Sequence, residues 1–203
     1  MRALAGTLLL LASGCTTSFL AKEPRPTTFE GAWAEQRDRF TRSFKLYDGL
    51  DDVAFATATY QAPSVREARV DRLADWKGIQ PSERETLLAA EREAAASSEE
   101  FLLAFFTSDR RANDLASRQG TWRIALLVQA DGEAEALPVK VEAVRTDPTV
   151  QGLYPYVTDF DQLYRIRFPR VPGPRPLAEL PFVLRIAGAK GRVEMRWGPG
   201  PAP

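Results

Sequence analysis

Two segments of this 203-residue chain gather residues that could bind a ligand. The longest segment expected between strands, SDRRANDLASRQG at 108–120, combines acids, arginines and an amide: Asp109, Arg110, Arg111, Asn113 and Asp114. Loops at the end of a rigid β-scaffold are frequent binding sites. We therefore interpret 108–120 as a possible binding loop. The alternative is local pairing between its own acids and arginines.

The second segment, 145–164, carries an aromatic group around Pro155. Its rings are Tyr154, Tyr156 and Phe160. Together they predict a possible ledge for a sugar or a peptide. The alternative is a cluster that closes the end of the fold.

The same segment holds Asp159 and Asp161, whose Asp-x-Asp spacing could ligate calcium through carboxylate oxygens. No acid follows them at EF-hand spacing, and Phe160 stands between them. We therefore predict no metal site.

A stripe of arginines is expected along one strand. Arg165, Arg167 and Arg170 lie on its outward side, and Arg175 follows just beyond. This stripe could contact phosphates or an acidic partner, and solvated charge at a strand edge is the alternative.

Signatures of catalysis are missing from the sequence. It contains no histidine, which excludes Ser-His-Asp and Cys-His catalysis and the usual zinc sites. It has no GxSxG, SxxK, Walker or dinucleotide-binding motif. Adjacent acids such as Glu99 and Glu100 would point to opposite faces of a strand and could not act as a pair. We expect no enzymatic activity and no cofactor.

The charge balance favours no nucleic-acid partner. The chain has 27 basic and 27 acidic residues, so its formal net charge is zero. A basic surface for phosphate backbones is not indicated.

The single cysteine, Cys15, follows an apolar run from Leu4 to Ala12 and the small residues Ser13 and Gly14. The run is too short to cross a bilayer but fits a secretory signal. This arrangement resembles the lipobox of bacterial lipoprotein precursors, with Ala12 where leucine is commonest. The resemblance implies cleavage before Cys15 and lipid on its thiol. It also implies sorting to the outer membrane, because Thr16 replaces the aspartate typical of inner-membrane retention.

Periodicity predicts a mainly β fold. We expect a helix from about residue 28, a hairpin over 44–60, and a helical hairpin at 64–97 that ends its first helix at Gly78. Capping boxes are expected from Ser64 and Ser82. The remaining strands are 101–107, 122–128, 137–144, 163–168, 182–188 and 192–197, of which the first two are apolar on both faces and therefore central.

These elements predict an antiparallel β-sandwich of the immunoglobulin-like kind, with about eight strands and an inserted helical hairpin. The expected organisation is a signal peptide at 1–14, a lipidated tether at 15–28, one sandwich domain at 29–197 with its insert at 64–97, and a flexible tail at 198–203.

The functional expectation is a lipid-anchored cell-envelope protein that binds or scaffolds an envelope partner and meets the membrane through Cys15. A carrier of lipids or lipoproteins is the alternative, and a carboxylate-dependent cell-wall hydrolase is a third.

Overall fold

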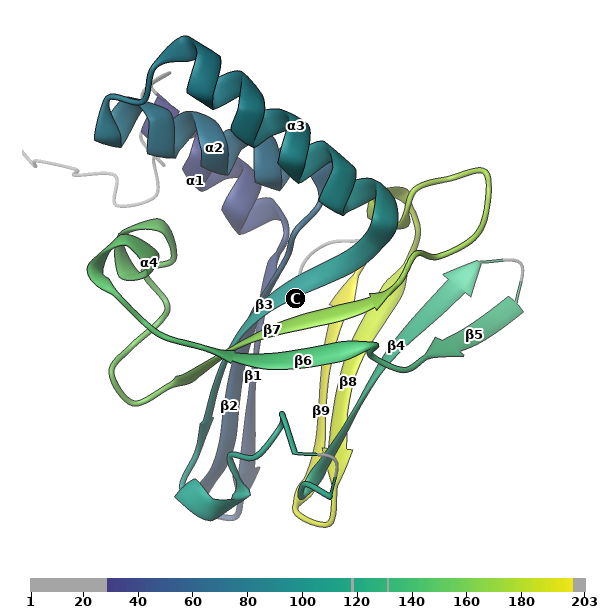
Figure 1. The fold of residues 1–203 in the computed structure, drawn as a ribbon. Coiled ribbons are helices and arrows are strands. Elements are labelled where there is room, and N and C mark those ends of the chain that lie inside the picture. The colour runs from purple at the N-terminus through teal and green to yellow at the C-terminus, as the bar shows by residue number, and fades with distance from the viewer. Residues whose placement is uncertain (1–28, 118, 131, 199–203) are drawn as a thin grey trace, which may run out of the picture.

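The computed structural model describes residues 29–117, 119–130 and 132–198. Figure 1 shows two β-sheets, with α1, α2 and α3 gathered at one end of them. Cys15, the expected signal peptide and the tether lie outside the described residues, as do residues 199–203 of the expected tail.

The first sheet has the strand order β1-β2-β3-β7-β6. These strands are β1 (Thr41–Asp48), β2 (Asp51–Tyr60), β3 (Ser98–Thr107), β6 (Lys140–Val144) and β7 (Gln162–Pro169). The second sheet has the order β5-β4-β8-β9. It consists of β4 (Trp122–Ala130), β5 (Gly132–Ala136), β8 (Phe182–Gly188) and β9 (Gly191–Trp197). Neighbouring strands are antiparallel, so the predicted mainly β, two-sheet fold is confirmed.

The two strands that are apolar on both faces take interior positions, as predicted. β3 lies between β2 and β7, and β4 lies between β5 and β8. Phe101, Leu103 and Phe105 are fully buried in β3, and the intervening Leu102 and Ala104 are also buried. A strand covered on both faces needs apolar residues at consecutive positions, and this requirement made both strands recognisable.

Aromatic rings join the two sheets in the core. Phe182 of β8 stacks on Trp197 of β9 with ring centroids 5.1 Å apart, and Phe101 of β3 meets Trp197 at 5.5 Å. The indole N–H of Trp197 donates a 2.9 Å hydrogen bond to the carbonyl of Phe40. The core therefore spans the layers and ties the segment before β1 to β9.

The α-helices are α1 (Phe29–Arg39), α2 (Pro63–Lys77), α3 (Pro81–Ser97) and α4 (Pro148–Leu153). Two 3-10 turns accompany them, η1 (Arg110–Ala112) and η2 (Leu177–Glu179). The predicted helical hairpin is present, and Gly78 ends α2 in the left-handed conformation, with φ of 63°. Among the described residues, no helix combines the length and apolar character needed to cross a membrane.

The predicted capping boxes are wrong. α2 and α3 each begin at a proline, Pro63 and Pro81, and no side chain caps either helix. Proline suits the first helical position because its missing N–H would have no intrahelical partner there. Each helix therefore starts two residues earlier than a serine cap would allow, and Ser64 and Ser82 lie inside the first turn.

The predicted strand at 137–144 is present only over 140–144, as β6, and residues 137–139 form a crossing between the sheets. β5 ends at Ala136 in the second sheet, and β6 begins at Lys140 in the first. Between them stands Pro138, which has no N–H for a ladder and is unfavourable inside a sheet. The helix α4 was also not predicted. Asp147 caps it by accepting a 2.8 Å hydrogen bond from the N–H of Val150.

The two lateral sides of the layered structure differ. On one side β1 contacts β9, and Arg42 Nε donates a 3.0 Å hydrogen bond to the carbonyl of Arg196. On the other side the edges are β6 in the first sheet and β5 in the second, joined by the crossing at 137–139. This second side holds the candidate site.

Candidate functional site

β5 covers only part of the edge of β4. Their pairing ends where Leu126 faces Ala136, so residues 122–125 have a strand neighbour on the β8 side alone. Two residues further along, the same register would bring Ile124 opposite Pro138. Proline cannot donate to a ladder, so the chain leaves the sheet at this point and the edge of β4 stays open.

The backbone of this open edge follows from the alternation of an antiparallel ladder. The N–H of Gln129 donates a 3.0 Å hydrogen bond to the carbonyl of Pro181, on the β8 side. Successive residues alternate in direction, so Trp122 and Ile124 direct their N–H and C=O groups away from β8. Among the described residues, no hydrogen bond reaches those groups on the open side.

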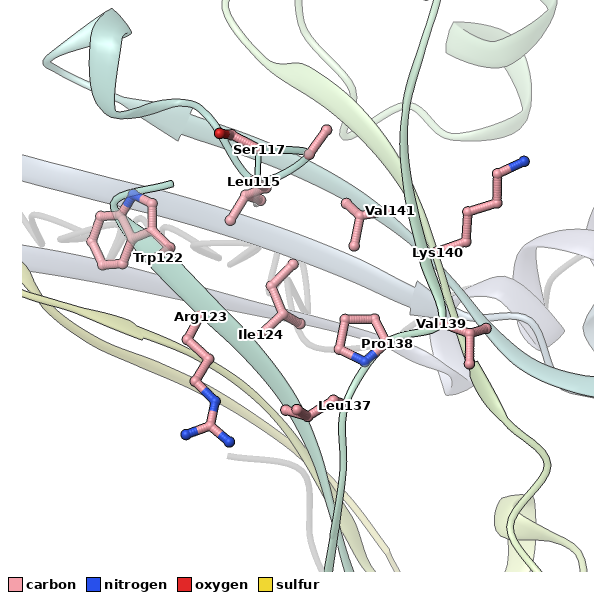
Figure 2. Close-up of a pocket in the computed structure, with 11 residues that line it drawn as sticks. Leu115, Ser117, Trp122, Arg123, Ile124, Leu137, Pro138, Val139, Lys140 and Val141 are labelled. Carbon is pink, nitrogen blue, oxygen red and sulfur yellow. The ribbon is translucent and has the colours of Figure 1, made fainter. Parts of the chain in front are cut away.

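The open edge borders a cavity of about 560 Å³ between the two sheets (Figure 2). We call it the groove. Its lining residues are Leu115, Ala116 and Ser117 from the loop before β4, Trp122, Arg123 and Ile124 from β4, and Leu137, Pro138, Val139, Lys140 and Val141 from the crossing and β6. Sites of about 300–1,000 Å³ accommodate small molecules or short segments.

The deep wall of the groove is apolar and firmly held. Leu115, Trp122 and Ile124 are each about 95% buried or more. The indole N–H of Trp122 donates a 2.8 Å hydrogen bond to the carbonyl of Ala112, and its ring meets Phe105 edge-on at 5.7 Å. These contacts fix the indole in one orientation.

The rim of the groove is apolar in part and positive in part. Leu137 and Val139, on either side of Pro138, are 50% and 65% exposed, and exposed apolar residues that gather in one place often mark a binding surface. Arg123 and Lys140 are the charged residues of the lining, and no carboxylate is among the eleven lining residues. The partners of the two cations, Glu135 at 2.7 Å and Glu142 at 2.8 Å, do not line the groove.

The loop at 108–120 contributes to the groove, but through residues other than the predicted ones. Asp109 accepts a hydrogen bond from the N–H of Arg111 at 3.1 Å and pairs with Lys190 at 3.0 Å. The hydrogen bond from Lys190 lowers the pKa of the Asp109 carboxyl. Arg110 and Arg111 are exposed on η1. Asp109 therefore stabilises the conformation of the loop and is not among the residues that line the groove.

The other two predicted loop residues also hold the backbone. Asn113 donates a 2.8 Å hydrogen bond to the carbonyl of Phe105 and accepts one from the hydroxyl of Tyr164. Asp114 accepts a 2.9 Å hydrogen bond from the N–H of Thr121. These contacts position the intervening Leu115, Ala116 and Ser117, which face the groove.

The three rings of the predicted aromatic ledge do not form one exposed surface. Tyr154 is 3% exposed and packs edge-on against Trp33 of α1, 5.4 Å away. Tyr156 is half-buried, and its hydroxyl lies 2.7 Å from that of Thr59. Phe160 is 76% exposed. The two tyrosines thus attach α1 and the 145–161 segment to the first sheet.

Asp159 and Asp161, the Asp-x-Asp pair, accept hydrogen bonds from nearby residues of the same segment. Asp159 accepts a 3.0 Å hydrogen bond from Gln151, and Asp161 accepts one of 2.8 Å from the N–H of Thr158. In the described part of the chain, no group of three or more acidic or cysteine side chains is arranged to hold a metal ion.

The arginine stripe converges on two buried acids. Glu99 and Glu100 are 2% and 8% exposed, and as neighbours in β3 their side chains leave opposite faces of the strand. Arg170 pairs with Glu99, whereas Arg167 and Arg165 lie 3.0 and 3.5 Å from Glu100. These arginines therefore neutralise internal charge. They do not lie at a strand edge, because β7 stands between β3 and β6, although the side chains of Arg165 and Arg170 remain 41% and 39% exposed.

The helical hairpin packs on the first sheet through a polar contact. Arg66 of α2 is 3% exposed and donates to the carbonyl of Gln61 at 2.9 Å and to Glu91 of α3 at 2.8 Å. Arg69 donates to the same Glu91 at 2.6 Å. Burial disfavours the charged form of Glu91, but Arg69 and Arg66 outweigh this effect and lower its pKa. One carboxylate thus fixes both helices over the end of the sheet.

Comparisons with known proteins give one structural likeness. No protein-family model matches the chain, and no curated protein matches its sequence. A solved structure from Burkholderia pseudomallei K96243, titled a novel protein of unknown function, is similar at 9% identity and a TM-score of 0.46. The match covers 83% of each chain.

The groove residues at 137–141 were missed by sequence analysis because their alternation predicts an ordinary strand over 137–144. A signal was present in LPVKV, where Pro138 separates Leu137 from Val139. A proline in such a run argues against a central strand and marks an edge or a departure from the sheet.

Proposed function

We propose that this protein is a lipid-anchored cell-envelope protein that binds a ligand in the groove. The single observation that carries the binding role is the open edge of β4 at Trp122 and Ile124, bordered by apolar walls and two cations. Exposed apolar side chains beside a cavity are typical of binding surfaces.

The anchor is proposed from the lipobox resemblance at Cys15. The 13 residues from Thr16 to Thr28 would tether the lipid to α1. Each acyl CH₂ buried in a bilayer contributes about 0.8 kcal/mol, so two or three chains would hold the protein on the membrane. We propose the outer membrane as its location.

For the fold, we propose the immunoglobulin-like arrangement. Constant-type immunoglobulin domains place strands A-B-E-D in one sheet and C-F-G in the other. If β2 is strand A, the orders here become A-B-E-D with β1 added at the edge, and C-F-G with β5 beside C. The helical hairpin then lies between strands A and B. This agreement of strand order supports the assignment.

The alternative function is a carrier of lipids or lipoproteins, with an acyl chain in the groove. The apolar wall of Leu115, Trp122 and Ile124 favours it. The hydrolase reading has less support, because the buried carboxylates Glu99 and Glu100 are paired with arginines.

A dye titration tests whether the groove binds ligands. Anilinonaphthalene sulfonate, an apolar anion, matches the apolar wall and the cations. Its fluorescence should rise with the soluble form beginning at Thr16. The double variant Leu137→Glu with Val139→Glu should weaken this binding several-fold, because it adds negative charge and removes apolar surface. Leu50→Glu makes a similar change at the exposed β1–β2 turn and should leave binding unchanged. Equal binding by all three proteins would contradict the proposal.

A further inference from the structure

We propose that the ligand of the groove is an extended peptide segment of a partner protein, which adds to the open edge of β4 as a further strand. This inference rests on the proposed function and names the class of ligand.

Along its open edge, the backbone of β4 has no partner among the described residues. Trp122 and Ile124 direct N–H and C=O groups to the open side, yet both residues are about 95% buried. An unpaired row of N–H and C=O groups at the edge of a sheet is a ready template for pairing with another chain. The chain's own candidate partner is Pro138, which has no N–H. An added strand supplies the missing donors and acceptors.

The groove lies beside this open edge. The groove borders β4 at 122–124, within the stretch that β5 leaves uncovered. Strand addition needs space beside the edge as well as free backbone groups. Both are present at the same residues, and Figure 2 shows the crossing and the start of β6, at 137–141, on the far side of that space.

The side chains along this edge also suit an added strand. Neighbours across a strand pair share a face of the sheet. The side chains of Trp122 and Ile124 belong to the core between the sheets, so alternate residues of an added strand would enter this space beside Leu115 and Val141. The other residues would face outward near Arg123.

Charge indicates the composition of the segment. The groove is lined by Arg123 and Lys140 and by no carboxylate. The complementary segment alternates apolar residues, which enter the groove, with acidic residues, which meet the cations. An acyl chain would use the apolar wall but would leave the backbone of Ile124 unpaired, and for this reason we favour the peptide.

Selection of peptides tests the inference. The full chain, immobilised through a carboxyl-terminal tag, is exposed to a displayed library of short linear peptides that are randomised at every position. We expect enrichment of sequences in which apolar and acidic residues alternate. The best synthetic peptide should slow amide hydrogen exchange at Trp122 and Ile124 while leaving the amides of the helical hairpin unchanged.

A modified peptide and two variants of the protein make the test specific. N-methylation of the two peptide amides that face β4 removes two hydrogen bonds and should weaken binding by about tenfold or more. Ala116→Trp should obstruct the groove and have a similar effect, whereas Leu50→Trp should have none. If Ala116→Trp does not fold, the double variant Leu137→Glu with Val139→Glu takes its place.

The possible outcomes separate this inference from the proposed function. Enriched peptides that are indifferent to N-methylation or to groove substitutions would overturn strand addition. Binding of palmitate in the groove, without any groove-dependent peptide, would also overturn it but would retain a ligand-binding groove. If the groove variants change neither the binding of peptides nor the binding of palmitate, both proposals fail.

Discussion

The hydroxyl of Tyr60 on β2 donates a 2.6 Å hydrogen bond to Oε2 of Glu99 on β3, and both side chains are almost completely buried. The other oxygen of Glu99 is paired with Arg170. A buried carboxylate needs such partners, because an unpaired charge at this depth is strongly unfavourable. Three residues that are far apart in sequence thus form one unit at the end of the sheet.

We predict that Tyr60→Phe lowers the free energy of unfolding by about 1.5–3 kcal/mol, the usual contribution of a hydrogen bond to a charged group. Urea unfolding at neutral pH measures this change. Tyr47→Phe, at a residue that is 51% exposed, is the matched control and should have almost no effect. Equal stability of Tyr60→Phe and wild type would show that Arg170 alone satisfies Glu99.

The same tyrosine predicts a loss of stability at high pH. Burial and the negative charge of Glu99 raise the pKa of Tyr60. Its stabilising contribution is complete below the unfolded pKa of about 10 and falls as the pH rises above it. Tyr60→Phe should therefore reduce the slope of stability against pH above about pH 10. An unchanged slope would contradict the prediction.

The ion pairs of Glu91 should make the protein less stable as the pH falls, which is the opposite dependence to that of Tyr60. Its pKa is lowered in the folded protein despite the opposing effect of burial, because Arg69 and Arg66 bind its carboxylate. Its contribution is present above the unfolded pKa of about 4.3 and is lost as the pH falls through the lower folded value. Glu91→Gln should be less stable than wild type at pH 7, and the difference should shrink towards pH 3. Glu93→Gln, on the same helix, is the control for unfolding measured at both pH values.

The buried ring of Phe105 predicts a large packing effect. Phe105 is fully buried in the central strand β3 and meets Trp122 edge-on across the two sheets. Phe105→Ala should lower the free energy of unfolding by about 3–5 kcal/mol through cavity formation. Chemical denaturation measures the effect, and near-wild-type stability would mean that the strand is peripheral.

A side chain at position 188 would clash with the backbone of the residue that precedes the neighbouring strand β4. A Cβ atom at this position would lie 2.2 Å from the carbonyl oxygen of Thr121, and a backbone atom yields little. Gly188→Ala should therefore destabilise the end of β8 beside Trp122 by about 1–3 kcal/mol, as overpacked sites do. Wild-type melting behaviour of this variant would show that the strand end shifts freely.

Cys15 predicts lipid attachment. Metabolic labelling with a tagged fatty acid should mark the wild type and should not mark Cys15→Ser. Equal labelling of both proteins would remove the anchor from the proposed function and leave the groove unaffected.

Local patterns were sufficient for most of the elements. Gly78 stops a helix by a conformation that other residues rarely adopt, and β3 is recognisable because a strand buried on both faces must be apolar throughout. The start of each hairpin helix was misplaced, because two prolines displaced the expected serine caps.

By itself, the sequence determined the mainly β class, the helical hairpin, the central strands and the expectation of a lipid anchor, since each follows from short-range spacing. Tertiary structure alone decided which sheet each strand joins and where the charges pair. Glu99 and Glu100 are paired with arginines of β7 and with the residue that follows it, more than 60 residues away, which no local pattern records. The groove has the same origin. It depends on the register that would place Ile124 opposite Pro138, and register is set by the packing of whole sheets.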